Sequence, residues 1–175
     1  MKEASDEIRT ERLLLRRARM GDVAAMHRIM SDPVAMRYWS TPPHSELAQT
    51  ERWIASMVED DPATRDDFIV TFNGQLIGKL GAWRLPEFGF LLDPAQWGRG
   101  FAREALAAFV ERRRSLGSTE LTADVDPRNA ASIKLLEWAG FTETGRASGT
   151  WVVGDELCDS VYFRLALQTS STSRP

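Results

Sequence analysis

The stretch EFGFLLDPAQWGRGFAREAL, residues 87–106, decides the fold of this 175-residue chain. Its first six residues alternate in hydrophobicity, which predicts a half-buried strand. Asp93-Pro94 ends that strand, and Gly98 and Gly100 stand immediately before apolar residues at helical spacing. The stretch therefore predicts a strand, a turn, a Gly-x-Gly loop and an amphipathic helix, in that order.

The start of the predicted helix is suited to an anion. The first N–H groups of a helix have no partner inside the helix, and they carry a partial positive charge. Glycines let the main chain approach a ligand closely because no Cβ intervenes. We therefore predict a pyrophosphate site formed by Trp97, Gly98, Arg99, Gly100, Phe101, Ala102 and Arg103.

Two common phosphate loops do not match this stretch. A Walker loop needs Lys followed by Ser or Thr after its last glycine, and neither follows Gly100. A dinucleotide fingerprint needs a small residue at position 103, which is Arg103 here.

The segment WGRGFA, residues 97–102, resembles the coenzyme A loop of the GNAT N-acetyltransferases. Gly100 and Ala102 match the glycine and the small residue of that loop, whereas Trp97 stands where many members have Arg or Gln. A Trp at this place is typical of the Rim-type branch, as is the preceding EFGF, residues 87–90.

A second segment carries the same resemblance. DPRNAASIKLLEWAGF, residues 126–141, contains Asn129 and Ser132 in the family's Asn-x-x-Ser pattern and ends in Gly140-Phe141. The two motifs follow one another in the family order and with similar spacing, and the resemblance extends over nearly the whole chain.

The residue patterns predict a mixed α/β fold. We expect strands at 12–18, 68–72, 75–85, 87–93 and 120–125 and on both sides of Gly154-Asp155, and helices that begin at Asp22, Asp32 and Ser45 and span 102–116 and 129–139. The resemblance implies the GNAT fold: a mostly antiparallel, twisted sheet of about seven strands, splayed in the middle and flanked by about four helices. We expect one domain over residues 8–167, with flexible termini at 1–7 and 168–175.

Composition sets further expectations. The net charge of −3 argues against a nucleic-acid partner, and no apolar run is long enough to cross a membrane. The first residues lack the apolar core of a signal peptide, so we expect a cytoplasmic location. A single cysteine excludes an internal disulfide, and two histidines far from it suggest no metal site.

The resemblance implies the transfer of an acetyl group from acetyl-CoA to a primary amine by direct attack in a ternary complex. The acceptor is expected to be a small molecule or a protein N-terminus, and the protein a monomer or homodimer. The other interpretation is an acyl-CoA-binding module without turnover. It rests on Leu136, which stands where many GNAT enzymes have a tyrosine that protonates the leaving thiolate.

Glu87 is the first candidate for the general base, because its side chain is expected on the strand face opposite Phe88 and Phe90. A structural carboxylate is the alternative role. Glu156 and Asp159 in the last hairpin are rival bases, and each also fits an exposed hairpin charge.

Ser132 is the candidate acid for the thiolate, with cofactor contact or packing as the alternative. Asn129 is expected to bond the pantetheine amide by resemblance, and its residue type also suits a helix N-cap. Arg99, Arg103 and Lys134 are candidate phosphate contacts.

Three further expectations concern the strand and the tryptophans. Phe90, Leu91 and Leu92 are expected to contact the cofactor, with a backbone N–H near Leu91 or Leu92 facing the developing negative charge. Trp39 and Trp53 are candidate acceptor residues, with core packing as the alternative. Trp83 and Trp138 fit core positions.

Overall fold

The computed structural model describes residues 6–59, 61 and 63–167 of the chain. The strands are β1 (Glu7–Arg9), β2 (Leu13–Arg16), β3 (Asp66–Phe72), β4 (Gln75–Arg84), β5 (Glu87–Leu92), β6 (Glu120–Val125), β7 (Thr142–Val153) and β8 (Glu156–Ala166). The α-helices are α1 (Val23–Met30), α2 (Leu47–Val58), α3 (Phe101–Ser115) and α4 (Ala130–Trp138). Two 3-10 turns, η1 (Met20–Asp22) and η2 (Pro94–Gln96), precede α1 and the loop before α3.

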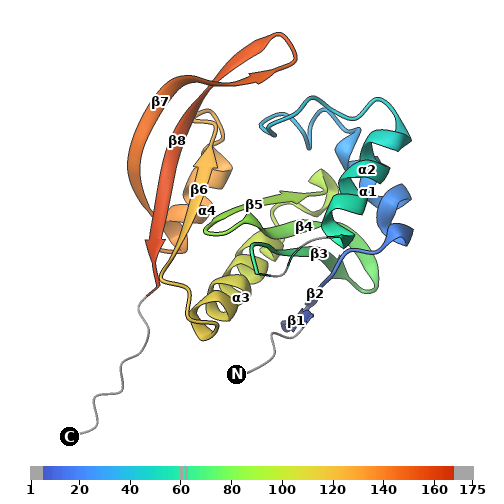
Figure 1. Ribbon diagram of the computed structural model, residues 1–175, viewed down its shortest axis with the longest axis horizontal. Helices are drawn as coiled ribbons and strands as arrows, with labels where there is room; N and C mark the ends of the chain where they lie inside the picture. The colour runs from blue at the N-terminus through green and yellow to red at the C-terminus, as the bar shows by residue number, and fades with distance from the viewer. Residues whose placement is uncertain (1–5, 60, 62, 168–175) are drawn as a thin grey trace, which may run out of the picture.

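The strands form one sheet in the order β1-β2-β3-β4-β5-β6-β8-β7. All neighbouring strands are antiparallel except β5 and β6. The prediction of a mostly antiparallel α/β sheet with four flanking helices is therefore confirmed. Figure 1 shows the two halves of this sheet, with β6, β7 and β8 on one side and β1 to β5 on the other.

The sheet has one strand more than the sequence predicted. This strand is β1, which pairs with β2 through Ile8 and Leu15. A single apolar residue among charged neighbours gave no strand signal, and Glu7, the last residue of the expected flexible terminus over residues 1–7, is the first residue of this strand. Residues 1–5 and 168–175 lie outside the described residues.

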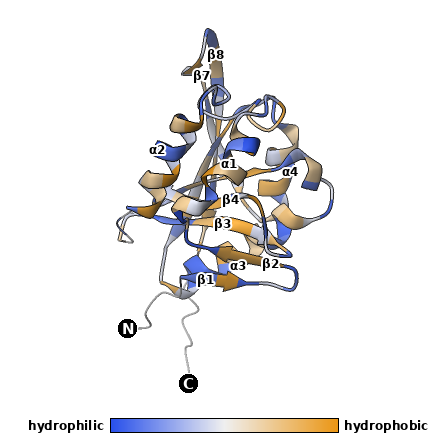
Figure 2. Cartoon of the chain, turned by 90° about the vertical axis from the view of Figure 1, so that its right-hand side faces the viewer, coloured by the Kyte–Doolittle hydropathy of each residue, from blue (hydrophilic) through white to orange (hydrophobic). Residues whose placement is uncertain are grey.

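Each face of the sheet carries its own hydrophobic cluster. On one face, Phe68 and Phe88 pack against Phe109 of α3 and Leu136 of α4. On the other face, residues of β3 and β5 pack against α1 and α2; they include Ile69, Leu91, Met26 and Ile54. Figure 2 shows apolar colour concentrated on the central strands β3 and β4.

The sheet is splayed between β5 and β6, as the resemblance implied. These two strands are in register only at Glu87 and Thr122, and the Thr122 N–H donates to the Pro86 carbonyl at 2.9 Å. Beyond this pair the strands diverge. The backbone groups of β5 that face β6 are thus left without a strand partner toward their C-terminal end.

Two local predictions are wrong. The segment after Asp32 does not form a helix: the Asp32 side chain accepts from the Val34 N–H and its carbonyl from the Met36 N–H, as at a helix start, but the following residues continue as turns. Trp83 and Trp138 are not core residues, since 39% and 49% of their surfaces are exposed. The indole of Trp138 instead lies under the Arg103 guanidinium, 5.1 Å from it.

Candidate active site

The loop before α3 presents its main-chain N–H groups outward. Gly98 and Gly100 adopt φ values of 73° and 81°, which side chains rarely allow. Among the described residues, no carbonyl or side chain accepts a hydrogen bond from the N–H groups of positions 98–103, and the first helical bond is Glu104 N–H to the Gly100 carbonyl. Six adjacent donors therefore remain available at a helix N-terminus.

A side-chain network fixes the loop from behind. Arg12 donates from Nη1 to the Arg99 carbonyl at 3.0 Å and from Nε to Glu104 at 2.7 Å. Glu104 also accepts from the Thr10 hydroxyl at 2.6 Å. Burial disfavours the charged form of Glu104, but these bonds outweigh it and lower its pKa. The carboxylate thus stays ionised and holds β2 to the first turn of α3.

The loop fits a nucleotide diphosphate. A Cβ built at Gly98 meets nothing within 4 Å, and one built at Gly100 meets only the Arg12 guanidinium at 3.4 Å, so both glycines border open space. Phosphate oxygens accept hydrogen bonds, and a helix N-terminus without committed donors is suited to them.

The cations predicted for the phosphates have other contacts. Arg99 donates to Gln96 at 2.6 Å and lies over the Phe101 ring, and Arg103 lies over the Trp138 ring. Lys134 is exposed on α4. Arg99 and Arg103 nevertheless flank the loop and give it a positive edge.

Trp97 connects the loop to the splayed strand. Its indole N–H donates to the Leu92 carbonyl at 3.0 Å, so this carbonyl points away from β4 and toward the gap. The N–H and C=O groups of one strand residue point to the same side, and the side alternates along the strand. The N–H groups of Leu92 and Phe90 therefore face the gap, whereas that of Leu91 faces β4.

The start of α4 is capped as the residue type of Asn129 suggested. The Asn129 side-chain oxygen accepts from the Ser132 N–H at 3.1 Å. The Ser132 hydroxyl takes no part in this cap and is half-buried on the first turn. Leu136 is fully buried in the core, and its alkyl side chain has no proton to donate to a thiolate.

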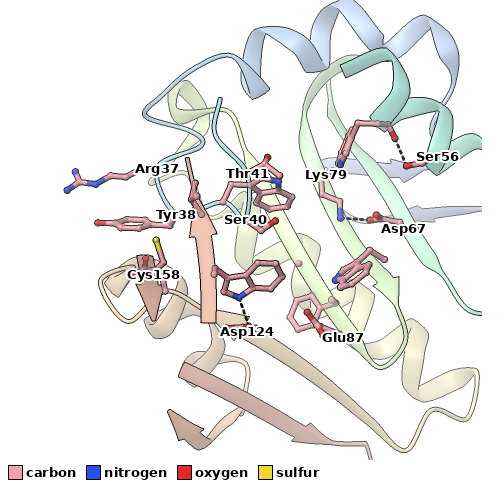
Figure 3. A pocket seen from close by; sticks show the side chains of 18 of the residues that line it. Arg37, Tyr38, Ser40, Thr41, Ser56, Asp67, Lys79, Glu87, Asp124 and Cys158 are labelled. Carbon is pink, nitrogen blue, oxygen red and sulfur yellow. Dashed lines mark hydrogen bonds and ion pairs between the residues drawn. The ribbon is translucent and has the colours of Figure 1, made fainter. Parts of the chain in front are cut away.

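A cavity of about 490 Å³ lies on the α1–α2 side of the sheet, within the size range of small-molecule sites. Its walls come from the segment 37–44, α2, the central strands and the β7–β8 hairpin. Figure 3 shows Glu87, Asp124 and the Lys79–Asp67 pair among its lining side chains. Of the residues predicted from sequence, Glu87, Trp39 and Trp53 line the cavity, whereas Asn129, Ser132 and the loop 97–103 do not.

The cavity is aromatic and acidic. The aromatic side chains that line it are Tyr38, Trp39, Trp53, Trp83 and Trp151. Aromatic faces attract cations, and the same wall carries the carboxylates of Glu87, Asp124 and Asp159. These features favour a ligand that combines an apolar body with a positive charge.

Glu87 has the properties of a general base. Partial burial raises its pKa, the negative charge of Asp124 raises it further, and the charge of Arg84 and the indole of Trp83 oppose the rise. A carboxylate with a raised pKa accepts a proton more readily than an exposed one. The predicted position, on the face opposite Phe88, is also what the structure shows, because Phe88 is buried among α3 residues.

The rival carboxylates are engaged elsewhere. Glu156 pairs with Arg128, which also holds Asp126. Asp159 lines the cavity, and it accepts from the Gly149 N–H at 2.8 Å. Both lie on β8 in the last hairpin.

Sequence reasoning missed Lys79 and Asp67. Lys79 is 2% exposed, and its ammonium lies 2.8 Å from the Asp67 carboxylate at the floor of the cavity. Both residues belong to strands that read as apolar, and only the pairing of β3 with β4 brings them together. The sequence signal for this pair was a charged residue within an otherwise apolar strand, Asp67 in β3 and Lys79 in β4.

Comparisons with known proteins identify the domain. The family model described as an acetyltransferase (GNAT) domain matches residues 12–142. The N-acetyltransferase p20 of Bacillus licheniformis is 30% identical over 167 residues, which cover 89% of this chain and 93% of that protein.

Solved structures agree in fold. A spermidine N-acetyltransferase from Vibrio cholerae, in complex with CoA and spermine, superposes with a TM-score of 0.78 at 21% identity, covering 90% of this chain and 97% of that one. A Salmonella typhimurium acetyltransferase that modifies the N-terminal serine of ribosomal protein L7/L12 gives a TM-score of 0.81 at 16% identity, covering 91% and 97%. At such low identity these neighbours show the shared architecture alone.

Proposed function

This chain belongs to the GNAT acetyltransferases, and on that premise we propose that it transfers the acetyl group of acetyl-CoA to a primary amine of a small molecule. The observation that carries the proposal is the arrangement of two sites. Uncommitted N–H donors lie at the start of α3, and the cavity with Glu87 lies on the α1–α2 side of the sheet, beside the β5–β6 gap.

The loop and the gap account for cofactor binding. The N–H groups of positions 98–103 bind the diphosphate, and the gap-facing backbone groups of β5 bind the pantetheine arm. When bound, acetyl-CoA supplies the acetyl thioester whose carbon–sulfur bond breaks as the carbon–nitrogen bond of the amide forms. The CoA complexes of structural neighbours support this assignment.

Glu87 removes the proton that blocks the amine. An alkylamine has a pKa of about 10.4, so it enters as an ammonium ion at neutral pH. The N–H bond breaks, an O–H bond forms on Glu87, and the nitrogen lone pair becomes available. The N–H of Leu92 or Phe90 is placed to stabilise negative charge that develops in the gap.

Ser132 is the candidate donor for the leaving thiolate. Its hydroxyl is not used by the helix cap, and the usual tyrosine position is a buried leucine. A thiolate is a weaker base than an alkoxide, so the Ser132 hydroxyl assists by donating a hydrogen bond, and the proton that completes the thiol is the one that the amine nitrogen loses as the amide forms.

The size and aromatic walls of the cavity favour a small acceptor over a protein chain. Spermidine, the substrate named for one structural neighbour, is a small polyamine, whereas another neighbour modifies a protein N-terminal serine. The panel of acceptors to assay is therefore phenethylamine, spermidine and a peptide with N-terminal serine.

A calorimetric titration with CoA tests the loop. We expect Gly100→Val to weaken CoA binding by about tenfold or more, because a branched side chain enters the open space above the donors and replaces a left-handed glycine. Gly117→Val is the matched control, since Gly117 also has a φ of 81°, at the other end of α3. Equal CoA affinity in the Gly100 variant and the wild type would remove the loop from the site.

Release of free thiol from acetyl-CoA, measured with the acceptor panel, tests turnover. Release that depends on an amine supports the transferase. CoA binding without release for any amine would favour the acyl-CoA-binding module, to which the absent tyrosine at position 136 lends support.

A further inference from the structure

A second carboxylate stands beside the candidate base. Asp124 lies on β6 two residues beyond Thr122, the residue in register with Glu87, so Asp124 and Glu87 project from the same face of the sheet. Both line the cavity, and Figure 3 shows them at the same end of it. The two carboxylates are close enough for Asp124 to act electrostatically on Glu87.

The β7–β8 hairpin holds Asp124 in place. The indole Nε1 of Trp151 donates to Asp124 Oδ2 at 2.9 Å, although the two residues lie 27 positions apart. Within the described part of the chain, no protein group donates to the other oxygen, Oδ1. A half-buried carboxylate with one oxygen fixed and the other open is ready to accept a hydrogen bond from a ligand.

The surrounding charges leave this end of the cavity negative. The other charged groups near the pair are Arg37, Arg65, Asp67, Lys79, Arg84, Asp126 and Asp159. Lys79 is neutralised by Asp67, and Asp126 by Arg128. Burial lowers the pKa of His44, so it adds no positive charge at neutral pH. Arg84 acts on Glu87 from a distance, but among the described residues no cation forms an ion pair with Glu87 or Asp124.

We propose that Asp124 is a second acceptor-binding carboxylate, which holds the ammonium form of the acceptor next to Glu87 and is kept in position by Trp151. This assignment rests on the proposed function. The acceptor nitrogen donates one hydrogen bond to Asp124 Oδ1 and another to Glu87. The proton then passes to Glu87, while Asp124 remains ionised and changes no covalent bond.

The chemistry selects the acceptor. A site with two carboxylates and aromatic walls favours an amine that is cationic at neutral pH and carried on an apolar body. A neutral molecule of the same shape gains only the apolar contacts. Asp124 therefore raises the affinity for a cationic acceptor relative to a neutral molecule of the same shape.

Tryptophan fluorescence measures the binding of phenethylammonium and of the neutral 2-phenylethanol. The difference between the two affinities separates the contribution of the charge from that of the apolar contacts. We expect Asp124→Asn to weaken ammonium binding by about tenfold or more and to leave alcohol binding within about twofold. Asn keeps the shape and can still accept from Trp151. Asp155→Asn, which removes an exposed charge of the same hairpin that does not line the cavity, is the control and should leave both affinities unchanged.

One further variant and one further measurement test the proposal. Trp151→Phe removes the indole donor and should weaken ammonium binding by a smaller factor than Asp124→Asn. In the pH profile of kcat/KM for phenethylamine, Asp124→Asn should move the acidic limb to lower pH, because the lost negative charge no longer raises the pKa of Glu87. Asp155→Asn should leave that limb in place.

The outcomes are distinguishable. The role of Asp124 is overturned if the Asp124→Asn protein binds the ammonium ion like the wild type, or if its affinities for the ammonium ion and for the alcohol fall equally. In either case CoA binding and amine-dependent thiol release by the wild type would still support the proposed function. A wild-type protein that binds CoA but neither phenyl compound overturns the cavity as an acceptor site and Asp124 with it. A protein that does not bind CoA overturns the proposed function.

Discussion

At the scale of single residues, the environment of Glu87 determines what it can do. The same carboxylate on an open strand would be a surface charge, but here Glu87 is half-buried near Asp124 and belongs to the one register pair that the described residues form between β5 and β6. Its raised pKa follows from these neighbours. Position and proton affinity together support the assignment as base.

Glu87→Gln tests that role. We expect kcat/KM to fall by about 10²- to 10⁴-fold, because the amide cannot accept the proton. The wild-type kcat/KM should rise with pH as Glu87 loses its proton, at a pH above the usual carboxyl range since its pKa is raised, and the variant should lack this limb. The CoA affinity, measured by calorimetry, should not change. A variant with the wild-type pH profile would dismiss Glu87 as the base.

Ser132→Ala separates catalysis from binding at the start of α4. We expect kcat to fall by about tenfold with a smaller change in CoA affinity, since the hydroxyl assists only the departure of the thiolate. The helix cap should survive, because Asn129 accepts from the Ser132 backbone and not from its hydroxyl. Circular dichroism checks the fold. A larger loss of CoA affinity than of kcat would reassign Ser132 to cofactor binding.

At the scale of elements, α3 is anchored at both ends. Its first turn is tied to β2 by Arg12 and Glu104, and its last turn is tied to β3 by Asp66. Asp66 is 2% exposed and accepts from Arg112 and Arg113 of α3 and from Arg17. The helix that presents the donor loop is thus fixed to the sheet by charges as well as by its apolar face.

Asp66→Asn should destabilise the fold by about 3–5 kcal/mol, because it leaves guanidinium groups beside a neutral amide in a buried site. Urea unfolding measures the free energy of unfolding. Glu111→Gln, which removes one partner of the exposed pair with Arg114, is the control and should cost at most about 1 kcal/mol. Equal effects in the two variants would contradict the anchoring role.

The pH dependence of stability gives an independent check on Asp66. Burial disfavours its charge, but the bonds from Arg112 and Arg113 and the nearby charges prevail and lower its pKa from the ordinary 3.8. The stabilisation is therefore present above that value and is lost as the pH falls through the lower, folded-state pKa. The Asp66→Asn protein should show a weaker loss of stability over this acidic range.

Local patterns explain which elements could be predicted. The donor loop, the following helix and the Asn129 cap depend on neighbouring residues, so the sequence alone indicated them. The Lys79–Asp67 and Trp151–Asp124 contacts depend on strand pairing and on the path of the hairpin, which no local pattern encodes. Strand β1 was missed because one apolar residue cannot define a period.

At the scale of the whole molecule, the sheet separates the two helix pairs, and the gap between β5 and β6 connects their sides. α3 and its donor loop pack with α4 on one face, while the cavity lies on the α1–α2 face. On the proposed function, the cofactor and the acceptor therefore approach from different sides and meet at the splayed strands. Their binding can be disturbed independently.

Gly89→Leu tests that independence. Gly89 lies on the cavity floor, where an added Cβ meets only Trp39 at 3.9 Å, so a leucine side chain would fill acceptor space without straining the backbone. We expect acceptor KM to rise by about tenfold or more, with CoA affinity within about twofold of the wild type. Gly145→Leu on β7 is the control, because nothing lies within 4 Å of its Cβ position. Equal loss of both ligands would contradict separate approaches.

The joint between the two halves of the sheet has a mechanical consequence. It is closed by the ring of Phe88 against those of Phe109 and Phe141, at 5.9 and 5.4 Å, and by one pair of strand residues. Apolar packing does not depend on a fixed bond direction as a ladder of backbone hydrogen bonds does. A change in the spacing of β5 and β6 would therefore break few backbone bonds, and each half of the sheet would keep its own ladder.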